Sequence, residues 1–113
     1  WSLNGQVPDL LQHNVFLGSD YKKSWNRGWR PEDFDSSNDP NFYVHNPTYT
    51  DPSTAPEGCD SVMILLPCAN LQETQAAAKK AGVAPPTRES MVEAGREAIL
   101  RRFERQGCGD LRD

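Results

Sequence analysis

The chain has 113 residues, of which 36% are hydrophobic and 25% charged, and its formal net charge at pH 7 is −4. This length suits at most one domain, and no apolar run approaches the about 20 residues of a membrane-spanning helix. The negative net charge argues against nucleic-acid binding, which requires a basic surface. Because the chain starts at Trp1, ends at Asp113 and is lean in core-forming residues, we expect it to be part of a longer protein.

Short extended segments are predicted at the start of the chain. Trp1 and Leu3 alternate around a polar residue, as at the end of a strand. Residues 13–17 (HNVFL) are bulky and branched enough for a short buried strand, which Gly18 ends.

A short helix follows, beginning at Ser19 as its N-cap and ending near residue 29. Its aromatic residues recur every four positions and form one stripe: Tyr21, Trp25 and Trp29. Core packing is the commoner role of such a stripe, and lining a lipid or polyene tunnel is the alternative. Residues 31–40 predict an exposed acidic connection with Phe34 as its only anchor.

Two further strands are predicted in the middle of the chain, at residues 42–45 and 61–66. Clusters of proline, glycine, aspartate and serine bound both segments, which is typical of strands. The loop between them contains Pro47, Pro52, Pro56 and Gly58, so we expect an ordered connection.

Two helices are predicted in the last third. Residues 71–80 are strong helix formers that end in two lysines before Gly82. The last helix runs from residue 88 or 90 to residue 106, with Ser90 in a capping box or Thr87 as the alternative cap. The apolar stripe predicted for it consists of Val92, Ile99 and Phe103. Its arginines, which alternate with glutamates, predict a solvated, salt-bridged face: Arg96, Arg101, Arg102 and Arg105.

The spacing of potential ligands and nucleophiles predicts no metal site and does not identify the catalytic residues. The two histidines, His13 and His45, have no ligand-spaced partner, and the three cysteines form no Cys-x-x-Cys pair. Cys68 follows an apolar run, which predicts a buried, inert thiol. A GxGxxG fingerprint is absent from the sequence, so this chain is not expected to hold a dinucleotide.

Several motifs nevertheless resemble a known family when they are taken in order. The distinctive pieces are His13-Asn14-Val15-Phe16-Leu17, Phe42-Tyr43-Val44, Asp51-Pro52-Ser53 with Ala55-Pro56-x-Gly58, and the run from Val62 to Pro67. In this order and spacing the chain resembles the middle-to-late part of the phytoene desaturases (phytoene dehydrogenases) of carotenoid biosynthesis, of the fungal and bacterial type.

The resemblance implies an α+β fold in which residues 1–113 form a single partial domain. This part would belong to the substrate domain of an FAD-dependent, amine-oxidase-like oxidoreductase with a Rossmann-type cofactor domain. FAD would be bound by the missing part of the parent protein, with NAD as the alternative acceptor. The reaction implied is dehydrogenation of phytoene, a C40 polyene, towards lycopene or a more desaturated carotenoid, by a membrane-associated intracellular enzyme.

The resemblance also implies a substrate pocket, for which the expected residues are Tyr43, His45, Tyr49 and Asn70. Tyr49 stands where the family pattern has arginine, and Asn70 stands where histidine is usual. The family motif itself consists of Asp51, Pro52, Ser53, Ala55, Pro56 and Gly58. Alternatives are a related polyene oxidoreductase or isomerase, a retinol-saturase-like enzyme, or a non-catalytic truncated paralogue. The 113 residues alone are expected to be inactive and only marginally stable.

Overall fold

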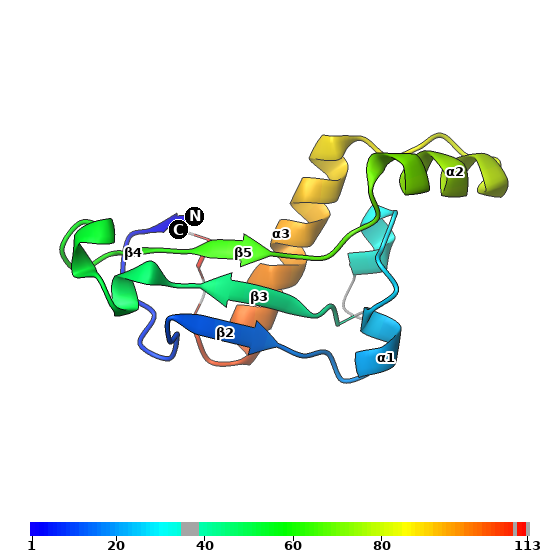
Figure 1. Cartoon of the computed structure of the whole chain (residues 1–113). Coiled ribbons are helices and arrows are strands. Elements are labelled where there is room, and N and C mark those ends of the chain that lie inside the picture. The colour runs from blue at the N-terminus through cyan, green and yellow to red at the C-terminus, as the bar shows by residue number, and fades with distance from the viewer. Residues whose placement is uncertain (35–38, 110, 113) are drawn as a thin grey trace.

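A computed structural model describes residues 1–34, 39–109 and 111–112. Within these residues the chain is an α+β structure with two small antiparallel sheets, three α-helices and three short 3-10 turns, as Figure 1 shows. The predicted α+β class is therefore confirmed. None of the described helices has both the length and the hydropathy needed to cross a bilayer.

The larger sheet has three antiparallel strands in the order β2-β3-β5. Strand β2 spans His13–Phe16, β3 spans Phe42–His45 and β5 spans Met63–Leu65. The strands predicted at residues 13–17 and 42–45 are thus confirmed, the first with its end one residue earlier. The burial expected for the first is wrong, because β2 is an edge strand whose residues are exposed or half-buried.

A two-stranded sheet joins β1 (Ser2–Leu3) to β4 (Asp60–Ser61). The single strand predicted at residues 61–66 is therefore wrong, because this segment is divided between the two sheets. Its first part follows β1, where the backbone N–H of Val62 donates to the carbonyl oxygen of Trp1 at 2.8 Å. Its second part pairs with β3. The local sequence carries no signal that one apolar segment will pair with two different strands.

Helix α3 (Arg88–Arg105) covers one face of the larger sheet (Figure 1). Phe103 is fully buried and meets the rings of Phe16 and Phe42 edge to face, at centroid distances of 5.3 and 5.8 Å. Such pairs stabilise a core beyond the burial of their apolar area. Gly95 lets the helix approach the end of β5, since a Cβ atom there would lie 2.9 Å from Leu66 Cδ2.

The extent predicted for α3 is confirmed, and of the two caps predicted the alternative, Thr87, is the one observed. The apolar stripe is wrong at Val92, which is 60% exposed because the first turns of the helix extend beyond the sheet (Figure 1). The helix is capped by Thr87, whose side chain accepts from the N–H of Ser90 at 3.1 Å. The Ser90 hydroxyl donates to the Thr87 carbonyl oxygen instead of capping the helix itself.

Helix α2 spans Leu71–Ala81 and confirms the helix predicted at residues 71–80. Asn70 and Glu73 form a reciprocal capping box at its start, and Gly82 ends it with a left-handed φ of 69°. These are the start and stop signals that local sequence encodes best.

The predicted aromatic helix is much shorter than expected. Helix α1 spans only Tyr21–Ser24, and its N-cap is Asp20 rather than Ser19. The stripe does not pack in the core, because Tyr21 and Trp25 are both exposed and contact each other edge to face at 5.8 Å.

The backbone at Trp29, where the predicted helix was to end, is not helical and is hydrogen-bonded to an acidic side chain. Asp33 Oδ2 accepts from the N–H of Trp29 at 2.9 Å, just before the 3-10 turn η1 (Pro31–Phe34). Phe34 is buried, as predicted for the anchor of this connection. Residues 35–38 of the predicted exposed connection lie outside the described residues. At its end the prediction is wrong, because Asp39 and Pro40 are half-buried and Asp39 forms ion pairs with α3.

The solvated arginine face predicted for α3 is wrong at Arg102. This side chain is buried, forms an ion pair with Asp39 and donates to the carbonyl oxygen of Leu17. Arg105 also pairs with Asp39, at 2.6 Å, and Arg101 donates to the carbonyl oxygen of Phe34 at 3.2 Å. These contacts hold α3 against segments that are distant in the sequence. The burial of Arg102 therefore could not be predicted from the residues around it.

Cys68 is exposed, which corrects the buried thiol expected from the preceding apolar run. The run ends with β5 at Leu65, and the chain then crosses towards α2. On this crossing the N–H of Ala69 donates to the carbonyl oxygen of Gly28 at 2.9 Å.

Candidate functional site: the open face of the sheet

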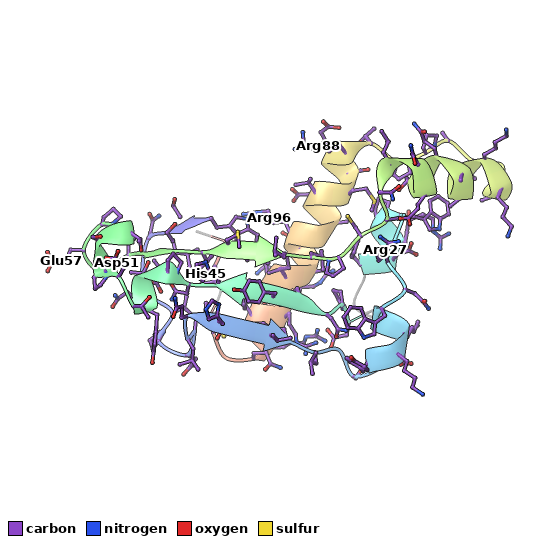
Figure 2. The ribbon with its side chains drawn as sticks, in the orientation of Figure 1. Arg27, His45, Asp51, Glu57, Arg88 and Arg96 are labelled. Atoms are coloured by element: carbon purple, nitrogen blue, oxygen red, sulfur yellow. The ribbon has the colours of Figure 1, made fainter. Side chains whose placement is uncertain are left out.

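The second face of the three-stranded sheet carries no helix among the described residues. Side chains alternate along a strand, so the residues between those that contact α3 point to this open face. In the views of Figures 1 and 2 helix α3 lies behind the sheet, and the open face is turned towards the reader. The residues of the open face are His13, Val15, Tyr43, His45, Met63 and Leu65.

The composition of the open face is unusual for a surface exposed to water. None of its six residues is aspartate, glutamate, lysine or arginine, although a solvated sheet face is normally polar. Val15 is 68% exposed, Leu65 54% and Met63 49%. Apolar side chains exposed together on one face of a sheet are typical of an interaction or ligand-binding surface.

A polar cluster lies at one end of the open face. The Nδ1 atom of His13 is 2.7 Å from the hydroxyl oxygen of Tyr43. His13 lies directly opposite His45 in the sheet, and the two imidazole rings are stacked with centroids 5.2 Å apart and planes 11° apart. His45 is labelled in Figure 2, on β3 at the side nearest the exposed turn. The face therefore combines apolar area with groups that can hold or move a proton.

The structure brings together two of the four predicted pocket residues. Tyr43 and His45 share the open face, whereas Tyr49 lies at the end of the 3-10 turn η2 (Pro47–Tyr49), beyond the sheet. Asn70 lies at the opposite end of the molecule (Figure 1) and caps α2, where its side chain accepts from the N–H of Glu73 at 2.9 Å. Tyr49 and Asn70 thus do not adjoin the two residues on the sheet.

Four residues of the open face were not predicted from the sequence as part of a pocket: His13, Val15, Met63 and Leu65. Their alternation with buried neighbours was a signal that could have identified them. That signal becomes specific only with the register, which places His13 opposite His45 and Leu65 opposite Tyr43.

The family-motif residues form a compact exposed turn at one end of the molecule, where Figure 2 labels Asp51 and Glu57. Asp51 caps the 3-10 turn η3 (Pro52–Thr54) by accepting from the N–H and the hydroxyl of Ser53, at 3.0 and 2.6 Å. These two hydrogen bonds lower the pKa of the Asp51 carboxyl from its ordinary value. Gly58 closes the turn with φ of 76°, a conformation that other residues adopt with strain. The ordered connection predicted between the strands is confirmed.

Apart from the open face, an apolar hollow lies between α2, α3 and the end of β5. Its volume is about 690 Å³, and its lining includes Ile64, Leu66, Leu71, Met91 and Val92. Arg88 and Arg96, labelled in Figure 2, lie along α3 at this hollow. The open face is the stronger candidate, since apolar side chains and a hydrogen-bonded His13–Tyr43 pair occur together there.

The described residues do not fit a metal or a dinucleotide. No group of three or more histidine, cysteine, aspartate or glutamate side chains in the described part of the chain is arranged to hold a metal ion. The starts of the two longer helices are occupied by their own caps, Asn70 with Glu73 and Thr87, and neither start follows a glycine-rich loop. Neither of these helix starts therefore offers free backbone N–H groups to a dinucleotide pyrophosphate.

Comparison with known proteins shows where the sequence has relatives. No family model matches the chain. The chain is 38% identical over 81 residues to a phytoene desaturase of Cercospora nicotianae, an alignment that covers 72% of this chain and 13% of that protein. It is 48% identical over 62 residues to a zeta-carotene-forming phytoene desaturase of Myxococcus xanthus, covering 55% and 11%.

A neurosporene-forming phytoene desaturase of Cereibacter sphaeroides is 33% identical over 106 residues, covering 91% of this chain and 19% of that protein. The chain thus spans less than a fifth of the length of these curated relatives. The matches confirm the resemblance that the ordered motifs predicted. Over most of its length, this chain corresponds to one segment of the phytoene desaturase family.

Proposed function

We propose that this chain is the part of a carotenoid desaturase that presents a polyene-binding sheet face. The parent protein would dehydrogenate phytoene towards lycopene or a more desaturated carotenoid. The relatives named phytoene desaturases support this reaction. The observation that carries the proposal is the open face, which is apolar, free of charged residues and backed by a packed core.

The chemistry of the substrate class agrees with this surface. A C40 polyene has no charge and no hydrogen-bonding group, so its recognition depends on buried apolar area. Removing one leucine, valine or methionine side chain from water contributes about 1.5–3 kcal/mol. Val15 is exposed on β2, and Met63 and Leu65 are exposed on β5, the two outer strands of the sheet, so each contributes part of this energy.

The cofactor proposed for the parent protein is FAD, with NAD as the alternative acceptor. Bound in a Rossmann-type domain of an amine-oxidase-like architecture, the flavin would supply the chemistry of hydride acceptance. The contribution proposed for this segment is to bind the polyene, orient it and exclude water, and the open face supports that role. Residues 1–113 would then be one part of the substrate domain.

Membrane association of the parent protein follows from the proposed substrate, because phytoene partitions into lipid. We place the enzyme at an intracellular membrane surface, where it can take up the polyene without releasing it to water. This localisation is part of the proposal and depends on the substrate class.

The test is to express the complete protein in a phytoene-accumulating bacterial host and to separate the pigments chromatographically. A desaturase converts phytoene to products that absorb at longer wavelength, because each step lengthens the conjugated system. An unchanged phytoene pool contradicts the proposal. Turnover of a different supplied polyene, such as a cis-carotenoid or retinol, would then favour the isomerase-like or saturase-like alternative.

A further inference from the structure

The polar cluster on the open face has a chemical use that apolar binding leaves unexplained. We propose that His13 accepts the proton that the substrate releases in each dehydrogenation, with Tyr43 and His45 as positioning residues. This inference rests on the proposed function. It concerns the removal of the proton, which is the part of the reaction that a hydride acceptor does not perform.

The atoms and electrons of the step balance as follows. Forming a C=C bond removes one hydrogen from each of two adjacent carbons. One C–H bond breaks with its electron pair, and the hydride passes to a two-electron acceptor of the flavin class, supplied by the rest of the parent protein. The other C–H bond leaves its electron pair behind as the new π bond, and its hydrogen departs as a proton. A face that excludes water requires a protein base for that proton.

The geometry selects one nitrogen of His13 for this role. Nδ1 is 2.7 Å from the Tyr43 hydroxyl oxygen and is therefore engaged, which leaves Nε2 as the remaining nitrogen of the ring. In the tautomer that the proposal requires, Nδ1–H donates to Tyr43, and Nε2 carries the lone pair. When Nε2 accepts the proton, the Nδ1–H donation to Tyr43 is retained in the imidazolium. The same hydrogen bond thus orients both forms of the base.

The two positioning residues hold the ring from different directions. Tyr43 reaches His13 diagonally from the neighbouring strand, since its direct cross-strand partner is Val15. His45 stacks on the face of the His13 ring with nearly parallel planes. Catalytic geometry depends on such support, because a base that rotates freely spends little time within reach of the proton.

The other side chains of the open face cannot replace His13 as the base. Val15, Met63 and Leu65 carry no proton-accepting group of comparable basicity, and a neutral phenol ordinarily keeps its proton near neutral pH. His45 occupies the central strand, where it is half-buried and one face of its ring is stacked against His13. His13 lies on the edge strand and is exposed, so a substrate chain lying across the apolar face can reach it.

The experiment compares four forms of the complete, cofactor-loaded protein: wild type, His13→Ala, His13→Gln and Tyr43→Phe. We expect both His13 variants to lose about 10²–10⁴-fold in kcat, the usual range for a missing general base. Added imidazole should restore part of the His13→Ala rate in proportion to its concentration, because it can occupy the vacated space. Tyr43→Phe should lower kcat less, and imidazole should not restore it.

A second readout does not depend on turnover. Phytoene binding to each variant in its cofactor-free form, measured by co-sedimentation with phytoene-loaded phosphatidylcholine vesicles, should stay within about twofold of wild type, since the apolar side chains remain. Ser90→Ala, which removes a hydroxyl at the start of α3 outside the sheet, is the control and should keep the wild-type kcat. Thermal unfolding shows whether each variant is folded, and His13→Gln provides the test if His13→Ala is not.

The outcomes separate this inference from the proposed function. A wild-type protein that converts phytoene while His13→Ala and His13→Gln do so equally fast overturns the proton role alone. A slow His13→Ala that binds phytoene but gains no rate from imidazole overturns it as well. A wild-type protein that leaves phytoene unchanged contradicts the proposed function itself. Slow His13 variants with intact phytoene binding and imidazole rescue support the inference.

Discussion

The two faces of one three-stranded sheet differ although the same strands supply both. The covered face presents Phe16, Phe42, Val44 and Ile64 to helix α3, and the fully buried Phe103 completes it. The open face alternates with it residue by residue and is equally poor in charge, yet it has no helix of its own among the described residues. An exposed sheet face of this composition is what the proposed polyene-binding role requires. We therefore attribute stability to one face and binding to the other.

The largest expected effect is on the covered face. Phe103→Ala should lower the free energy of unfolding by about 3–5 kcal/mol, because the ring is fully buried and its removal leaves a cavity beside Phe16 and Phe42. Chemical denaturation of the complete protein measures this loss. Val15→Ala is the matched control on the open face, and it should change stability by no more than about 0.5 kcal/mol. Equal losses of unfolding free energy in the two variants would contradict the assignment of stability to the covered face alone.

The next effect tests how the covering helix is attached. Asp39→Ala should lower the free energy of unfolding by about 2–3 kcal/mol, because it leaves the buried guanidinium of Arg102 without its carboxylate. The same denaturation experiment measures the loss. Arg105→Ala removes only the half-exposed partner of Asp39 and should cost at most about 1 kcal/mol. If the Arg105 variant were the less stable of the two, the attachment of α3 would not depend on the buried pair.

On the open face the expected effect is on binding. Leu65→Asn should weaken phytoene binding by about 5–30-fold, which corresponds to about 1–2 kcal/mol. The reason is that the polyene would cover a polar amide, which must lose its water, in place of the two methyl groups of the exposed Leu65. The stability of the variant should stay near that of wild type, because the side chain is exposed in the segment. Ile64→Asn alters the next residue, which faces the core, and should instead destabilise the fold. Vesicle co-sedimentation and chemical denaturation together distinguish these two outcomes.

Local sequence was sufficient where local contacts determine the structure. Helix α2 was predicted almost to the residue because Asn70, Glu73 and Gly82 provide its start and stop. Strand β3 was predicted with its correct bounds from the turn-forming residues on either side. The turn at Asp51 was predicted as an ordered connection because its prolines restrict the backbone.

The failures came from partners that are distant in the chain. Val62 bonds to Trp1 while the residues after it pair with β3, so one apolar run became two strands. Arg102 is buried because Asp39 and the Leu17 carbonyl oxygen meet it across more than 60 residues. The site was affected in the same way, since the pairing of His13 with His45 and Tyr43 requires a register that periodicity alone does not supply.

The smallest effect is expected in the motif turn, which belongs to neither face. Ser53→Ala removes the hydroxyl donor to Asp51, so the pKa of that carboxyl should rise towards its ordinary value of 3.8. In wild type this pKa is lowered in the folded state. The contribution to stability is therefore present above the ordinary value and lost as the pH falls through the lowered one. Carboxyl-carbon NMR titration measures the shift.

Since Asp51 is fully exposed, the change in stability should be small, and phytoene binding should not respond. The matched control is Thr50→Ala, whose hydroxyl donates to the Pro47 carbonyl oxygen and not to Asp51. An Asp51 pKa that is the same in wild type and Ser53→Ala would refute the hydrogen-bond explanation. Weakened phytoene binding in Ser53→Ala would instead extend the binding surface from the open face to the turn, because the substitution touches no residue of the sheet.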